Sequence, residues 1–76
     1  MSARPGDIET IRIPIGQAAG HQLRGIAEND RGRHWLRWAL RWPGWDDEFQ
    51  EALEEYARMR APLIWRSWRR EQRGEA

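Results

Sequence analysis

The segment from Arg33 to Trp42 holds three tryptophans and three arginines within ten residues. When this segment is wound as a helix, with about 100° per residue, the two residue types fall on opposite sides. The tryptophans follow the spacing of one helix face, and the arginines recur every four residues on the other. Aromatic and cationic side chains in this arrangement are typical of nucleic-acid-binding surfaces and of protein interfaces. The segment therefore predicts one amphipathic helix around which the rest of the chain must build its core.

The length of the chain and its lack of cysteine limit the classes of protein it can belong to. Its 76 residues suffice for one small domain of marginal stability. Without cysteine it can form neither disulfides nor thiolate metal sites. No apolar run approaches the roughly 20 residues of a membrane-spanning helix, and residues 1–6 lack the apolar stretch of a secretory signal. We therefore expect a protein that does not use membranes.

The charges are unevenly distributed along the chain. All thirteen basic residues are arginines, and the formal net charge is +1. The charge is +3 over residues 1–45, −4 over 46–60 and +2 over 61–76. Guanidinium groups bind phosphate and carboxylate through paired hydrogen bonds and stack on aromatic rings. Such a chain can bind a polyanion at its basic segments, or dock its basic end on its own acidic segment.

The first third of the chain predicts an arm followed by a β-hairpin. Residues 1–7 contain proline, glycine and small polar residues, which are typical of an unstructured arm. Isoleucines alternate with other residues in 9–15, as in a half-buried strand, and Pro14 restricts that strand to a sheet edge. The glycine-bracketed segment 16–20 predicts a chain reversal, and 21–23 predicts a short return strand.

The remaining sequence predicts helices separated by strong ending signals. A short helix is expected at 23–29, and Asn29 or Asp30 should cap the aromatic helix at 31–42. The Pro-Gly pair that follows ends this helix, and three acidic residues at 46–48 favour the start of the next one. Pro62 suits the first position of a last helix, which continues through residues 63–72.

These elements together predict a small α+β domain, mostly α-helical, with a short N-terminal β-hairpin and three to four helices. The expected organisation is a flexible arm at 1–7, a hairpin-plus-helices domain at 8–60, and a C-terminal Trp/Arg helix with a frayed tail at 61–76.

The tryptophans are expected to supply much of the core, because large rings bury the most apolar area. The three tryptophans of the aromatic helix should therefore face inward. The apolar side of that helix is wider than one neighbouring helix can cover, so one indole should remain near the surface, with Trp42 and Trp45 as the candidates. In the last helix, Trp65 and Trp68 pack on the domain, form a dimer interface or stack on a ligand.

Several pieces of the sequence occur in an order that resembles a known family. These pieces are Ile13–Gly20, Leu23, Ile26–Glu28, Asp30, Gly32, Trp35–Leu40, Leu53 and Tyr56. They resemble the C-terminal domain of exodeoxyribonuclease X-like proteins and its stand-alone relatives in phages and bacteria. The resemblance covers about residues 11–57 and leaves the segment after Pro62 outside.

The resemblance implies a small hairpin-plus-helices module, often attached to nucleases or helicases, that helps to engage nucleic acid. Members of the family carry two basic residues in the turn, where this chain has Gln17 and Ala19. If those basic residues contact phosphate in the relatives, this chain lacks the contacts or makes them with arginines elsewhere.

The sequence does not indicate catalytic chemistry. His21 and His34 are its only histidines, and they do not have metal-ligand spacing. There is no cysteine nucleophile, and no glycine-rich loop with a lysine joins a strand to a helix. We therefore expect no enzyme activity, no metal and no cofactor.

The favoured function is that of a non-enzymatic, nucleic-acid-associated module, encoded by a phage or mobile element, that contacts phosphate without strong sequence preference. DNA and RNA remain alternatives. The arginines expected to contact phosphate are Arg24, Arg33, Arg37, Arg41, Arg66, Arg69 and Arg70.

The alternative function is that of a protein-interaction module, either a regulator or inhibitor of a larger host or phage enzyme or a homodimeric adaptor. Tryptophan and arginine are enriched in protein interfaces, which favours this alternative. The expected interface residues are Trp42, Trp45, Trp65 and Trp68. In both cases we expect a cytoplasmic location, which is the host cytoplasm if a phage encodes the protein.

Overall fold

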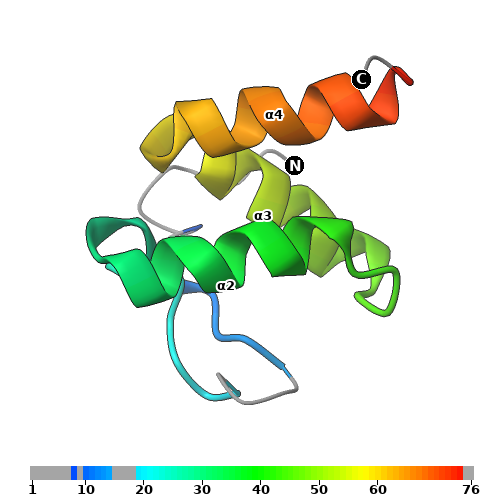
Figure 1. Ribbon diagram of the computed structural model, residues 1–76. Coiled ribbons are helices and arrows are strands. Elements are labelled where there is room, and N and C mark those ends of the chain that lie inside the picture. The colour runs from blue at the N-terminus through cyan, green and yellow to red at the C-terminus, as the bar shows by residue number, and fades with distance from the viewer. Residues whose placement is uncertain (1–7, 9, 15–18, 75–76) are drawn as a thin grey trace.

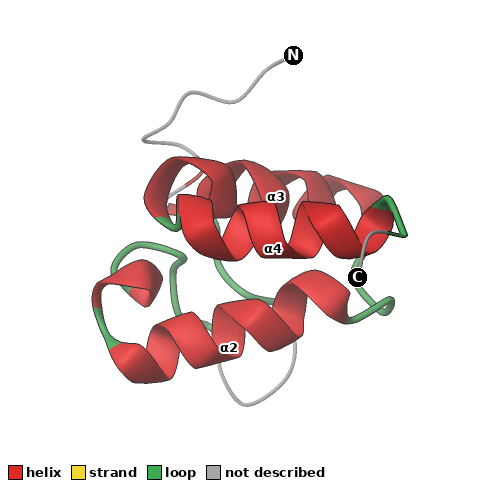
Figure 2. Ribbon diagram, turned by 45° about the horizontal axis from the view of Figure 1, so that its top comes forward, coloured by secondary structure: helices red, strands yellow, loops and turns green. Residues whose placement is uncertain are grey.

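The computed structural model describes residues 8, 10–14 and 19–74. This part of the chain forms a 3-10 turn, η1 (Ile26–Glu28), and three α-helices, α2 (Asp30–Arg41), α3 (Asp47–Arg60) and α4 (Pro62–Gln72). Helices α3 and α4 form an antiparallel pair, and α2 crosses below them (Figure 1). Figure 2 shows α3 and α4 in one layer and α2 in the other. Within the described ranges, no helix combines the length and apolar character needed to cross a membrane.

The three α-helices begin at the residues that the sequence indicates. The side chain of Asn29 accepts a hydrogen bond from the N–H of Gly32 at 2.7 Å. At the start of α3, Asp46 accepts one from the N–H of Phe49, also at 2.7 Å. Each cap satisfies a backbone donor that the first helical turn leaves unpaired. Pro62 occupies the first turn of α4, where a missing N–H needs no partner. The predicted helix starts are therefore confirmed.

The core lies between the three helices and includes residues from all of them. Its apolar side chains are Leu36, Ala39 and Leu40 of α2, Phe49, Leu53, Tyr56 and Ala57 of α3, Ile64 and Trp68 of α4, and Ile8, Ile13, Leu23, Trp45 and Ala61 between or before these helices. Because Ile64 and Trp68 are buried in this core, α4 is packed as part of the domain.

The predicted N-terminal β-hairpin is wrong, because the described residues contain no strand and no sheet. The two expected arms meet only in one antiparallel bridge, between Arg12 and Gln22. Beyond this bridge the N–H of Gly20 donates to the carbonyl of Ile13 at 2.9 Å, so the chain makes a turn where a ladder would have to continue. The predicted arm at 1–7 and the turn residues 15–18 lie outside the described part. What the structure describes is a small all-helical domain.

Helix α2 buries a different face from the one that the tryptophan spacing predicts. Leu36 and Leu40 are its buried centre, whereas Trp35 and Trp42 are half-buried and Trp38 is 49% exposed. The smaller side chains of α2 enter the core. The larger indoles lie on the flank of α2, where the loop that follows the helix covers part of them. The expectation that all three indoles face inward is therefore wrong for Trp38.

Candidate nucleic-acid interface

Two of the three arginines predicted to form a strip on α2 are neutralised by carboxylates of the same molecule. Arg33 forms an ion pair with Asp30 and donates to the carbonyl of Ala27 at 3.0 Å. Arg41 makes two hydrogen bonds to Glu71 of α4, with Nε–Oε2 and Nη2–Oε1 distances of 2.7 and 3.0 Å. Because both guanidinium groups already hold an anion, α2 does not present the continuous row of free cations that the sequence predicts.

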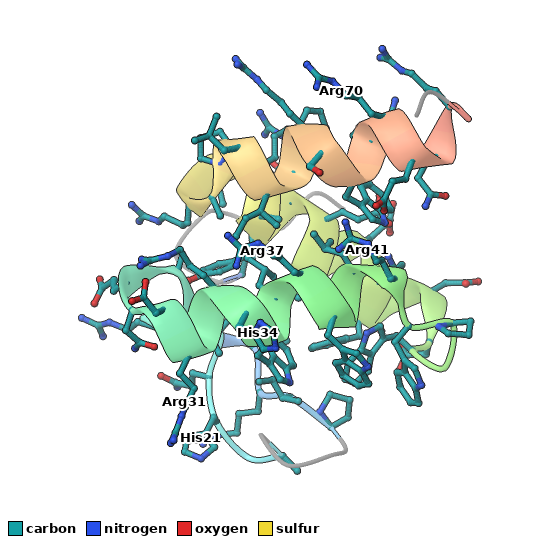
Figure 3. The ribbon with its side chains drawn as sticks, viewed as in Figure 1. His21, Arg31, His34, Arg37, Arg41 and Arg70 are labelled. Carbon is teal, nitrogen blue, oxygen red and sulfur yellow. The ribbon has the colours of Figure 1, made fainter. Side chains whose placement is uncertain are left out.

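The third arginine of the strip, Arg37, has no ion pair with any described residue. It is exposed, and its carbonyl accepts a hydrogen bond from the guanidinium of Arg41. Both side chains project from α2 toward α4 (Figure 3). Arg37 is therefore an available cation at the border between the two helices.

The densest group of available cations lies on the outer face of α4. Trp65 and four arginines line a shallow groove there with a volume of about 160 Å³. These arginines are Arg66, Arg69, Arg70 and Arg73. Small-molecule sites usually enclose about 300–1,000 Å³, so this groove suits contact with an extended ligand better than enclosure of a small one. We call these five residues the α4 basic face.

The spacing of the α4 basic face follows from helix geometry. Residues three, four and seven positions apart share one side of a helix, and Ile64 and Trp68 occupy the opposite, buried side. The guanidinium of Arg69 lies 5.7 Å from the ring centre of Trp65, within the range of a cation–π contact. Figure 3 shows Arg70 pointing away from the rest of the molecule.

No ion pair among the described residues involves an arginine of the α4 basic face. The single carboxylate in α4, that of Glu71, is turned to Arg41 of α2. Four like charges on neighbouring turns repel one another, and an anion from outside relieves this repulsion. The face is therefore electrostatically suited to a ligand with repeated negative charge.

The structure brings the predicted phosphate-binding arginines together only in part. Arg66, Arg69 and Arg70 share the α4 basic face, to which Arg73 is an addition that the sequence prediction missed. The sequence did contain a signal for Arg73, because a residue seven positions after Arg66 lies on the same side of a helix. Arg24 lies elsewhere, in a hollow of about 340 Å³ between η1 and α3 that also contains the carboxylate of Glu28.

Two of the four predicted interface tryptophans are not on the surface. Trp45 is 8% exposed and Trp68 is 6% exposed, so both belong to the core. Trp42 and Trp65 are half-buried. Trp38, which was expected in the core, is the more exposed indole. The prediction that Trp45 lies near the surface is therefore wrong, because the chain turns back after α2 and inserts this ring beside the helix that it has just left.

The acidic helix α3 carries its own compensating cation. Arg58 forms an ion pair with Glu55 three residues earlier. The hydrogen bond from Arg58 lowers the pKa of the Glu55 carboxyl, and the same contact raises the pKa of Arg58. Among the described residues there is also no group of three or more histidines and carboxylates that could hold a metal ion. The distinctive chemistry of the described surface is therefore its cationic α4 face.

Comparison of the chain with models of known protein families, with curated proteins and with solved structures gave no match. The resemblance to the exodeoxyribonuclease X-like C-terminal domain therefore stays a prediction from sequence.

Proposed function

We propose that this protein is a non-enzymatic module that binds nucleic acid through phosphate contacts of the α4 basic face, with Arg37, between α2 and α4, as a further available cation. The observation that carries the proposal is the group of four guanidiniums around Trp65 without a carboxylate partner among the described residues. A phosphate backbone offers the repeated negative charge that such a group lacks. The contacts are to the backbone, so binding is expected to tolerate different sequences.

Salt dependence is the main physical signature of this mode of binding. Each phosphate that a guanidinium neutralises releases counterions, so the logarithm of affinity falls linearly with that of salt concentration. For a single strand, each contact contributes about 0.7 to the slope. Binding should therefore weaken steeply between about 50 and 200 mM salt.

The test measures the affinity of the protein for fluorescently labelled single-stranded and duplex oligonucleotides. Their length is about 15 nucleotides, which is within the range of site sizes of single-strand-binding domains. The variant R66Q/R70Q removes two charges from the α4 basic face. It should weaken binding by at least about tenfold at 50 mM salt and reduce the salt slope for a single strand by about 1.4.

The matched control is R24Q/R58Q, which removes the same charge from positions outside α4. Arg24 lies beside η1, and Arg58 lies on α3, where Glu55 already neutralises it. Both double variants lower the net charge equally, so only a local role of α4 separates them. Absence of oligonucleotide binding at 50 mM salt, or equal losses in the two variants, would contradict the proposal.

A second candidate function is self-association, and the charges of α3 and α4 favour it. The exposed side of α3 carries Asp47, Glu48 and Glu51, whereas the outer side of α4 is basic. The acidic helix of one copy could therefore dock on the α4 basic face of another. Light scattering coupled to size exclusion tests this directly: a monomeric mass at high protein concentration and low salt would exclude it.

A further inference from the structure

Trp38 is an exposed indole held in a fixed position. Its ring is 49% exposed and stacks on Trp42, with ring centres 5.6 Å apart and planes inclined by 22°. Trp42 directly follows α2, four residues after Trp38, and its ring supports one side of the Trp38 ring. Trp38 thus combines a large apolar surface with substantial access to solvent.

The neighbouring rings prevent Trp38 from folding away into the core. Trp45 meets both indoles edge-on, with interplanar angles of 82° to Trp38 and 78° to Trp42. Its own Nε1–H donates to the carbonyl of Ala39 at 2.8 Å, which anchors it to α2. Gly44 packs against the Trp42 ring so closely that a Cβ there would collide with it. The exposed ring is therefore preorganised, and a ligand that covers it loses little entropy in ordering it.

The charge around Trp38 indicates the kind of ligand. Of the exposed arginines one or two turns away from Trp38, Arg31 has no ion pair with any described residue, whereas Arg41 already holds Glu71. The acid nearest to them in sequence, Asp30, is paired with Arg33. An aromatic surface near an available guanidinium is suited to a flat, apolar group that belongs to an anionic chain. An unpaired nucleobase within a nucleic-acid strand has both properties.

We infer that Trp38 stacks on an unpaired nucleobase, so that the nucleic acid bound by this protein is single-stranded. This inference rests on the proposed function and specifies its ligand. In a duplex the base faces are covered by their neighbours, whereas a single strand offers them to aromatic side chains. Arg37 and Arg41 project from α2 toward α4 (Figure 3), and Arg37 has no ion pair with any described residue.

The experiment compares three labelled oligonucleotides of about 15 nucleotides. They are oligothymidine, an abasic strand with the same sugar-phosphate backbone, and a duplex. All three carry phosphates, but only the first presents unpaired bases. The protein should bind oligothymidine about tenfold or more tightly than the abasic strand. Equal affinity for these two strands would overturn the inference without the need for any variant.

Substitutions then locate the effect. W38A should abolish the preference for oligothymidine over the abasic strand, and W38F should retain most of it because phenylalanine keeps a ring that can stack. The matched control is L63A, because Leu63 on α4 is, within the described part of the chain, the other large exposed apolar side chain and is 78% exposed. Circular dichroism verifies that each variant is folded. An unchanged preference in W38A would overturn the inference.

The results separate this inference from the proposed function. If the protein binds the duplex and the abasic strand as well as oligothymidine, and R66Q/R70Q weakens all three, only the role of Trp38 fails. If none of the three binds at low salt, the proposed function and the inference fail together. If the wild-type protein is a dimer by light scattering and W38A is a monomer, Trp38 belongs to a protein contact and the inference is overturned.

Discussion

Gly32 shows how strongly one residue in α2 depends on its tertiary surroundings. It lies in the first turn of the helix, and its N–H donates to the capping side chain of Asn29. A Cβ at this position would collide with the backbone carbonyl of Ile26 in η1. The glycine therefore allows η1 to pack directly on the start of α2.

We predict that Gly32→Ala destabilises the protein, although the same change in an isolated helix is favourable by about 0.5–1 kcal/mol. The clash with a backbone atom should cost about 1–3 kcal/mol instead. Urea denaturation measures the change, with Arg31→Ala at the neighbouring exposed position as control. An unchanged or raised free energy of unfolding in Gly32→Ala would contradict the close approach of η1.

The side chain of Tyr56 joins α3 to η1. Its buried hydroxyl accepts a hydrogen bond from the N–H of Ala27 at 3.0 Å. We predict that Tyr56→Phe lowers the free energy of unfolding by about 1–3 kcal/mol, because the N–H of Ala27 loses its acceptor in a partly buried place. Amide exchange at Ala27 should also accelerate, and unchanged protection at that amide would argue against this contact.

The Glu55–Arg58 pair makes the stability of the folded protein depend on pH. The Glu55 carboxyl has a lowered pKa in the folded state because Arg58 donates to it. Its contribution to stability is therefore complete above its unfolded pKa and is lost as pH falls through the lowered folded pKa. We predict that Arg58→Gln raises the pKa of Glu55, as measured by NMR titration of the carboxyl carbon. Both groups are exposed, so the change in stability should be small.

At the scale of elements, the pair between Arg41 and Glu71 joins α2 to α4. The two side chains are 38% and 49% exposed, so water and salt screen their attraction. A double-mutant cycle with Arg41→Gln and Glu71→Gln should give a coupling energy of about 0.2–1 kcal/mol. Raising salt to about 1 M should remove most of this coupling. A coupling several times larger would show that the pair is less accessible than the structure indicates.

For the whole molecule, α4 contributes both to the core and to the charged surface. Its inner side buries Ile64 and Trp68, and its outer side carries the α4 basic face. Replacing one buried tryptophan by alanine typically costs about 3–5 kcal/mol, which equals most of the stability that a core of fewer than 80 residues supplies.

We therefore predict that a chain ending at Ala61 does not fold, even though the sequence resemblance stops before α4. Circular dichroism should show greatly reduced helicity and no cooperative thermal transition. A cooperative transition in the shortened chain would show that α4 is an addition to an already complete domain.

The sequence by itself determined where the helices start and end. Asn29, Asp46 and Pro62 act within their own helical turn, so their effect does not depend on distant parts of the chain. The arginine-rich character of α4 was likewise visible, because residues on one helix keep their relative positions in any fold.

Only the tertiary structure decided which of these features are available at the surface. The partners Arg41 and Glu71 are 30 residues apart in the chain, and the burial of Trp45 depends on how the loop after α2 turns back. The same is true of the N-terminal segment, where Ile11 and Ile13 pack on a helical core and the described residues form no sheet. Spacing along the chain determines which residues share a side of a helix, but the position of the other helices determines which side faces water.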